Sequence, residues 1–182
     1  MNAPATSLAE RLAADADGIL ENLAREYGVS LLDVVTAMPE AGPGAMRTLL
    51  PGDRFADVMA EISHWGDVTL LTHSADAILE FHGRVPVGRS AHGFFNLRGG
   101  GSLSGHIRAD RCTTIALVER PFMGLATASV IFFNPDGGAM YKVFVRRNKD
   151  KSLDAEQLVR FRALAAAKTC CGGCQGEGSC GD

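Results

Sequence analysis

The chain has 182 residues, enough for one domain with a substantial hydrophobic core. Its 18 Lys and Arg residues against 21 Asp and Glu residues give a formal net charge of -3, so it carries no general attraction for nucleic acid or for an anionic membrane surface. The longest apolar runs, such as residues 126–133, are far shorter than the roughly 18 residues that cross a bilayer, and the first residues lack an export signal. We therefore expect a cytoplasmic protein that is not membrane-embedded and does not bind nucleic acid.

The first 50 residues have the pattern of a helical hairpin with a linker. Two pairs have the spacing of a capping box: Ser7 with Glu10 and Ser30 with Asp33. The apolar spacing around the intervening glycine also resembles a DNA-binding helix-turn-helix. A recognition helix carries Arg, Lys, Asn or Gln toward the bases, whereas residues 31–38 contain one acid and no base. We interpret the region as a hairpin packed on the body, with DNA binding as the disfavoured alternative.

The rest of the chain alternates between short strand patterns and isolated helices. A linker or long loop is expected over residues 39–51, a helix from about residue 53 to 65, and a last helix from Asp154 to about residue 168. Between these helices, β-branched and aromatic runs separated by turn residues predict strands at 68–72, 77–81, 93–97, 102–107, 113–119, 127–133 and 139–146. The fold class is therefore α+β with a broad antiparallel sheet, N-terminal helices and a C-terminal helix. We divide the chain into a helical hairpin and linker (1–50), a body (51–168) and a tail (169–182).

Histidines are the side chains with the clearest chemical potential. Five fall between positions 64 and 106, and His73 and His106 lie at or near the ends of apolar, strand-like runs. Neutral imidazole is a versatile metal ligand, and the surrounding apolar residues suit a large flat ligand. The hydrogen-bonding groups of a strand histidine can also be satisfied by a backbone carbonyl or by water. His64 and His82, which precede turns, fit that interpretation better. His92 is left open.

Several short motifs follow one another in a distinctive order. They are PGD at 51–53, WGDVT at 65–69, HSAD at 73–76, ILEF at 78–81, HGFFNLR at 92–98, SGHI at 104–107, IALVER at 115–120, FMG at 122–124 and TAS at 127–129. From about residue 17 to 166 this series resembles the HutX/ChuX family of cytosolic heme carriers.

The resemblance implies a fold, a ligand and an assembly. The fold would be one α+β domain similar to one repeat of the larger HemS-type heme proteins. Two copies would form a homodimer arranged like the two repeats of those proteins. The ligand would be heme b, with histidines at the positions of His73 and His106 implicated in holding the iron. The partner would be a heme-degrading or heme-receiving protein in iron acquisition. The alternative is a heme-degrading or heme-modifying enzyme, which would share the pocket.

Aromatic and basic residues complete the expected heme site. Burying the ring at about 25 cal/mol per Å² supplies much of the affinity before the iron is ligated. Candidate wall residues are Phe94 and Met123, with Phe81, Phe95, Leu103 and Ile107. Candidate partners for the propionates are Arg98, Arg89 and Arg108. Each also has an ordinary interpretation, as core for the apolar residues and as solvated surface charge for the arginines.

Four of the five cysteines fall in the last thirteen residues: Cys170, Cys171, Cys174 and Cys180. They could supply thiolates for zinc, copper(I), an iron–sulfur centre or a heme contact. Their spacing matches no standard cluster motif, and the segment is rich in glycine, so an unstructured tail is the other interpretation. The body contains one cysteine, Cys112, and so no disulfide framework is expected, in keeping with a reducing compartment.

Overall fold

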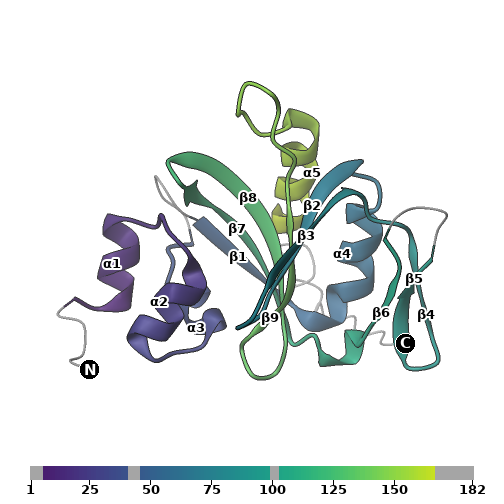
Figure 1. The fold of residues 1–182 in the computed structure, drawn as a ribbon, viewed down its shortest axis with the longest axis horizontal. Coiled ribbons are helices and arrows are strands. Elements are labelled where there is room, and N and C mark those ends of the chain that lie inside the picture. The colour runs from purple at the N-terminus through teal and green to yellow at the C-terminus, as the bar shows by residue number, and fades with distance from the viewer. Residues whose placement is uncertain (1–5, 41–45, 99–102, 167–182) are drawn as a thin grey trace, which may run out of the picture.

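The computed structural model describes residues 6–40, 46–98 and 103–166, and it has the expected α+β architecture (Figure 1). One broad sheet contains six antiparallel strands in the order β1-β7-β8-β9-β2-β3. Their bounds are Met46–Pro51 for β1, Asp67–His73 for β2, Ile78–Arg84 for β3, Thr114–Phe122 for β7, Leu125–Phe133 for β8 and Ala139–Phe144 for β9. The chain-consecutive strands β7, β8 and β9 form the centre, and the β2–β3 hairpin is added beside β9.

A second sheet contains three short strands: β4 (Gly88–Ala91), β5 (Phe94–Leu97) and β6 (Gly105–Ile107). The strands predicted near 93–97 and 102–107 therefore do not extend the broad sheet. They pair with each other, and β5 also pairs with β4. The sequence did not suggest β4, because Gly-Arg-Ser-Ala has neither β-branched nor aromatic side chains.

The linker prediction was wrong for the last six residues of its range. Met46–Pro51 forms β1, which pairs with β7 so that Leu50 lies opposite Ile115. β1 is an edge strand of the broad sheet. Proline is tolerated at such an edge because an unpaired side of the strand needs no N–H donor. The proline that indicated a loop in the sequence is therefore compatible with a strand here.

In the described ranges, five helices surround the broad sheet: α1 (Leu8–Ala14), α2 (Leu20–Tyr27), α3 (Leu31–Thr36), α4 (Phe55–Ile62) and α5 (Ala155–Ala166). Both predicted capping boxes are confirmed, at Ser7 with Glu10 and at Ser30 with Asp33. Single 3-10 turns lie at Gly52–Arg54 and Ala109–Arg111. No helix in the described ranges is long and apolar enough to cross a membrane.

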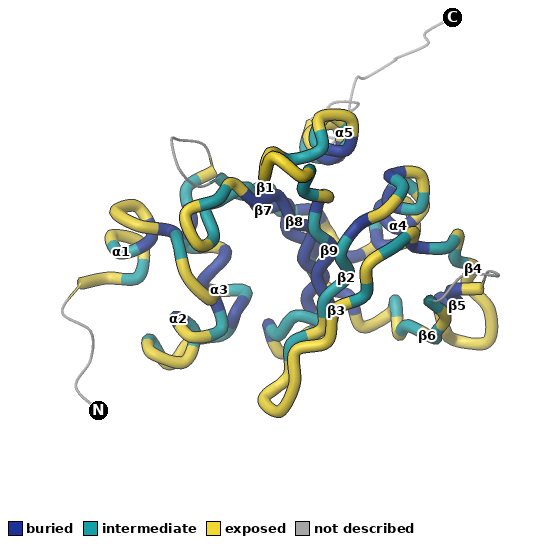
Figure 2. The backbone as a smooth tube through the Cα atoms, turned by 45° about the horizontal axis from the view of Figure 1, so that its top comes forward, coloured by how far each residue is buried: buried dark blue, intermediate teal, exposed yellow. Residues whose placement is uncertain are grey.

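Period-two alternation divides the core between the two faces of the broad sheet. On β7, Ile115 and Leu117 pack with α4, α5 and the small sheet, whereas Ala116 and Val118 pack with α1–α3. The N-terminal region, expected as a hairpin, consists of the three helices α1–α3, and Figure 1 shows them on one side of the broad sheet with α4 and β4–β6 on the other. We call these two sides the hairpin face and the α4 face. In Figure 2 the central strands are dark blue, and the tip of the β2–β3 hairpin is yellow and exposed.

Candidate functional site

A cavity of about 310 Å³ opens on the hairpin face, between the start of α2 and the broad sheet. Its volume lies at the lower end of the range for small-molecule sites. Alternate residues of the strands point into it, which is why it draws side chains from most of the sheet. Its lining residues are Ile19, Leu20, Glu21, Thr69, His73, Ile78, Glu80, His82, Arg120, Phe122, Thr127, Lys142, Phe144, Val145, Arg147 and Leu153.

Three polar side chains meet at one end of this cavity. The ammonium of Lys142 donates a hydrogen bond to the carboxylate of Glu21, and Nδ1 of His73 lies 3.2 Å from the same carboxylate oxygen. Only 9% of the Lys142 side chain and 19% of the Glu21 side chain are exposed. Burial opposes ionisation of Glu21, but the charge and hydrogen bond of Lys142 outweigh it and hold the pKa of Glu21 below its ordinary value. The cavity therefore contains a partly buried carboxylate that faces an imidazole.

A second cation is held by the backbone at the cavity wall. Arg120 donates from one guanidinium nitrogen to the carbonyls of Ala16, at 2.8 Å, and Pro121, at 3.0 Å. Burial lowers its pKa, although the charges of Asp17 and Glu21 oppose this effect. Arginine remains protonated at neutral pH despite such a shift, so Arg120 contributes a fixed positive charge.

His82 also lines the cavity, although its place before a turn had suggested an ordinary surface role. Its Nδ1 lies 3.0 Å from the hydroxyl of Thr69, directly across the β2–β3 pair. The period-two alternation of the strand could have indicated His82, because Ile78, Glu80 and His82 occupy one face of β3.

Three further lining residues were not predicted from the sequence. Glu21, Arg120 and Lys142 come from α2, β7 and β9, and only the order of the strands in the sheet brings them together.

His106 lies in the small sheet, on its outward side. Phe95 and Leu97 of β5 point into the core on the α4 face, so Asn96 and the residue paired with it, His106, are on the opposite side of the small sheet. The imidazole Nδ1 lies 2.6 Å from Oδ1 of Asn96. The ring of Phe94 meets the imidazole edge-on at 5.9 Å, and the guanidinium of Arg108 lies 5.8 Å from the Phe94 ring centre.

The structure does not bring His73 and His106 together within one chain. His73 lines the cavity on the hairpin face, whereas the small sheet that contains His106 packs on the α4 face. The broad sheet itself separates them. A ligand held in the cavity therefore contacts His73 of a chain but not His106 of that chain.

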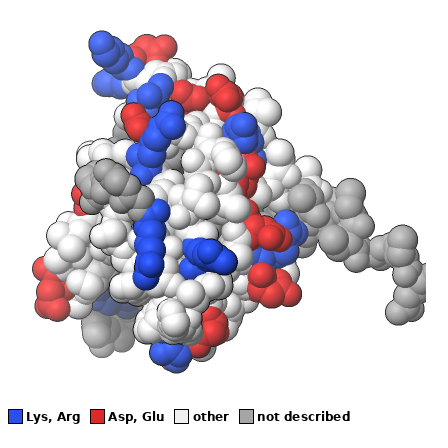
Figure 3. Space-filling model, turned by 90° about the vertical axis from the view of Figure 1, so that its right-hand side faces the viewer, with Lys and Arg blue, Asp and Glu red and all other residues white. Residues whose placement is uncertain are grey.

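The other predicted residues have different surroundings. Phe94 is 39% exposed beside His106, and Arg98 is exposed just after β5. Figure 3 views this side of the molecule and shows basic side chains, in blue, and acidic ones, in red, on a largely uncharged surface. Phe95 is buried against Phe55, and Ile107 packs against the same core, so both have a structural role here.

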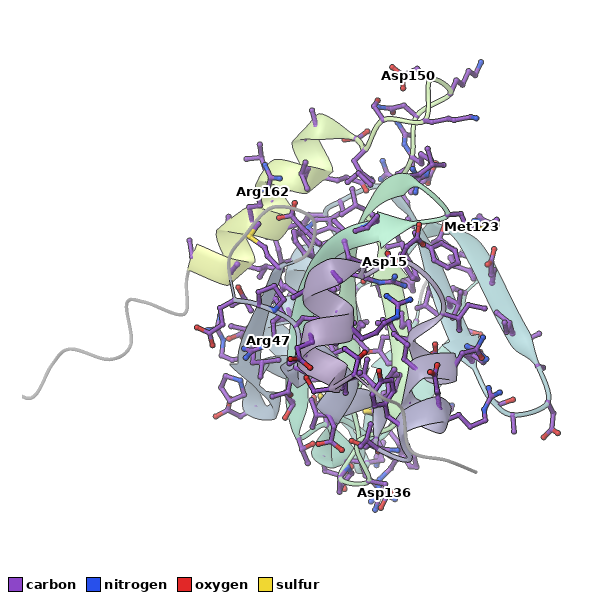
Figure 4. The ribbon with its side chains drawn as sticks, turned by 90° about the vertical axis from the view of Figure 1, so that its left-hand side faces the viewer. Asp15, Arg47, Met123, Asp136, Asp150 and Arg162 are labelled. Carbon is purple, nitrogen blue, oxygen red and sulfur yellow. The ribbon has the colours of Figure 1, made fainter. Side chains whose placement is uncertain are left out.

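Met123 is 79% exposed in the turn between β7 and β8. Its backbone N–H and that of Gly124 donate to the two carboxylate oxygens of Asp17, at 2.7 and 2.8 Å. Figure 4 shows Met123 at the outer end of that hairpin, in the region where Asp15 follows α1. Met123 therefore follows Phe122, which lines the cavity, but is not itself a lining residue.

The remaining candidates are not at the cavity. His64 is exposed after α4, and His92 occupies the β4–β5 turn with a φ of 53°. Cys112 is buried, which raises the pKa of its thiol to about 11 and makes it a poor thiolate ligand at neutral pH. The predicted thiol site at Cys170, Cys171, Cys174 and Cys180 lies outside the described residues.

The comparisons with known proteins agree on one family. The sequence matches the family model for haem utilisation ChuX/HutX over residues 48–164, which is more than half of the chain. The chain belongs to the ChuX/HutX family. It is 32% identical over 143 residues to the intracellular heme transport protein HutX of Vibrio cholerae, covering 78% of this chain and 72% of that protein.

Solved structures support the same assignment. A crystal structure of a protein from Erwinia carotovora has 51% identity and a TM-score of 0.84, covering 89% of this chain and 98% of that one. The heme-binding protein ChuX has 48% identity and a TM-score of 0.81, covering 89% and 99%. The predicted membership of the HutX/ChuX family is therefore confirmed.

More distant structures share the fold alone. PhuS, a heme-binding protein from Pseudomonas aeruginosa, has 17% identity and a TM-score of 0.69, and the match covers 90% of this chain but 50% of PhuS. ChuS, an Escherichia coli heme oxygenase, has 12% identity and the same TM-score, with 49% of its chain covered. The predicted likeness to one part of a larger heme protein is thus confirmed at the level of fold.

Proposed function

We propose that this protein is a cytoplasmic carrier of heme b that takes up imported heme and passes it to a heme-degrading or heme-storing partner. The observation that carries the proposal is the cavity on the hairpin face, where His73 and two cations stand among apolar side chains. The named functions of the HutX and ChuX relatives, heme transport and heme binding, point the same way.

The chemistry of the cavity fits heme as cargo. Ile78, Phe122 and Phe144 offer apolar surface to the ring. His73 would supply the iron ligand through Nε2, because its Nδ1 faces Glu21 and a carboxylate beside the other ring nitrogen orients a ligating imidazole. Arg120 offers positive charge that a propionate requires. The open side of the cavity would permit release of the ring to a partner.

We propose in addition that the functional unit is a homodimer. His73 and His106 lie on opposite sides of the broad sheet, so both could act on one heme only if His106 came from a second copy. The edge strand β3 is available for such an assembly, since Ile78 is 52% exposed and Leu79 is 67% exposed. PhuS is about twice the matched length, which is consistent with two copies of this fold acting together.

We infer a carrier and not an enzyme because oxygen chemistry at heme needs a fixed proximal ligand and a shaped polar distal pocket. In the described part of the chain, the imidazoles that line the cavity are those of His73 and His82, and both come from the β2–β3 hairpin, so the cavity does not set a distal imidazole across from a proximal one. The likeness to the heme oxygenase ChuS, at 12% identity, concerns the fold. Heme degradation is accordingly the alternative that the experiment below must separate.

An absorbance titration with hemin tests the proposal. The purified protein should give a saturable Soret shift, and His73→Ala should change the Soret position or weaken binding. The matched control is His64→Ala, because His64 is exposed at the end of α4 and does not line the cavity. A featureless titration of the native protein would refute heme binding, and equal effects of the two variants would refute the assignment to this cavity.

A further inference from the structure

We propose that Asn96 is a positioning residue that keeps the imidazole of His106 protonated on Nδ1 and leaves Nε2 free to bind heme iron. The inference rests on the proposed function for its ligand, but its first step concerns the protein alone. It starts from the environment of the Asn96 amide, which is 6% exposed in the small sheet.

Three backbone carbonyls fix the orientation of that amide. Nδ2 of Asn96 donates to the carbonyl oxygens of Arg89 at 3.2 Å, Ala91 at 3.0 Å and Phe94 at 3.0 Å. The flipped amide would place Oδ1, which can only accept, against these three carbonyl oxygens and lose the three hydrogen bonds that Nδ2 donates. The hydrogen-bond network therefore assigns Nδ2 to the carbonyl side and Oδ1 to the side of His106.

The orientation of the amide determines the tautomer of the histidine. Oδ1 of Asn96 can only accept, so Nδ1 of His106, at 2.6 Å, must carry the hydrogen. A neutral imidazole has one ring hydrogen, and Nε2 consequently holds the lone pair that a metal requires. His106 is exposed, so this nitrogen is not enclosed by the core. The geometry corresponds to the outer-shell hydrogen bond that orients metal-ligating histidines.

The geometry of the β4–β5 hairpin sets the position of Asn96. The turn at His92 and Gly93 has φ values of 53° and 77°, and two consecutive positive values are typical of a type I′ hairpin turn. Gly88 is required nearby, because a Cβ there would lie 2.0 Å from the ring of Phe95. Asn96 on β5 thus lies opposite Arg89 on β4 and opposite His106 on β6. The ring of Phe94 lies edge-on to the same imidazole.

Nitrogen-15 NMR of the histidine rings in the heme-free protein tests the first step. The native protein should show a protonated Nδ1 and an unprotonated Nε2 at His106 when the ring is neutral. In Asn96→Ala the balance should move toward the Nε2-protonated form, while the His64 signals stay unchanged as an internal control. A native His106 protonated on Nε2 would overturn the proposal, even if Asn96→Ala does not fold. An unchanged tautomer in folded Asn96→Ala would overturn it equally.

Hemin titrations test the second step. Asn96→Ala should weaken hemin binding by about 10–100-fold, the usual effect of losing an outer-shell partner. The double variant with His106→Ala should lose no more affinity than His106→Ala alone, because Asn96 acts through that ring. Ser90→Ala, an exposed position on β4, is the control for changes to the hairpin. If the affinity losses of the two single variants multiply in the double variant, Asn96 has a general structural role and the proposal is overturned.

The outcome for the proposed function is separate. A native protein that binds no hemin would refute the proposed function and the iron-binding role of His106, whereas the NMR result would still decide how Asn96 sets the tautomer of the His106 ring.

Discussion

The variant Glu21→Ala removes the carboxylate that Lys142 and His73 share at the end of the cavity. Removing one partner of a buried ion pair costs about 3–5 kcal/mol, because the remaining charge stays buried without compensation. The side chain of Lys142 is 9% exposed and that of Glu21 is 19% exposed, so the pair is not fully buried. We therefore expect a loss at the lower end of this range, about 3 kcal/mol. The double variant Glu21→Ala/Lys142→Met should recover at least half of the loss, because it also removes the uncompensated charge.

Urea unfolding measures this effect. With an m-value of about 2 kcal/mol/M for a chain of this size, a loss of about 3 kcal/mol lowers the midpoint by about 1.5 M. The matched control is Asp110→Asn, which breaks the ion pair between Arg108 and Asp110 at a site where both side chains are more than half exposed, and it should leave the midpoint nearly unchanged. If Glu21→Ala shifts the midpoint no further than Asp110→Asn does, the reasoning about a buried pair is refuted.

The pH dependence gives a second check on the same pair. The folded pKa of Glu21 lies below its ordinary value, so the stabilisation is present above the unfolded carboxyl pKa, about 4.3, and is lost as the pH falls through the folded pKa. The stability difference between the native protein and Glu21→Gln should accordingly be complete at pH 7 and shrink below about pH 4. A difference that stays constant to pH 2 would contradict an ionised Glu21 in the folded state.

Three further predictions concern the proposed carrier. Bound heme should persist with ascorbate and air in the presence of catalase, and stoichiometric loss of the Soret band with release of an open tetrapyrrole would instead identify a heme-degrading enzyme. Light scattering should report a dimer, and a monomer at every concentration with and without hemin would contradict the proposed assembly. Truncation after Lys168 should leave the heme spectrum and affinity unchanged, because the described body supplies the cavity. A tenfold loss of affinity would show that the tail cysteines contact heme, and metal that disappears on truncation of anaerobically prepared protein would identify a separate thiol site.

Local signals in the sequence predicted much of the secondary structure. The capping boxes at Ser7 and Ser30 are local interactions between residues three positions apart, so no tertiary information is needed to find them. Gly28 ends α2 with a φ of 66°, a conformation that glycine adopts without the cost of a Cβ. The strand patterns were also local, although β1 was missed because Pro51 suggests a loop unless the strand is known to be at an edge.

The candidate site was only partly predictable. Alternation along β2 shows that Thr69 and His73 share a face, but not which layer covers that face. In the sequence, Arg120 and Lys142 are about 20 residues apart, and Glu21 is about 100 residues from Arg120 and about 120 from Lys142, so nothing local relates the three. Their meeting depends on α2 packing over a sheet in which β7, β8, β9 and β2 are neighbours.

The sequence by itself therefore determined the capped starts of α1 and α3, the end of α2 at Gly28, the face that each strand residue shares with its neighbours, and the motifs that identify the family. Tertiary structure decided that β4–β6 form a separate sheet and that His73 and His106 lie on opposite sides of the broad sheet. The physical reason is the range of the interactions. Caps and alternation arise within a few residues, whereas strand pairing order and the packing of layers depend on burying apolar faces that are distant in the chain.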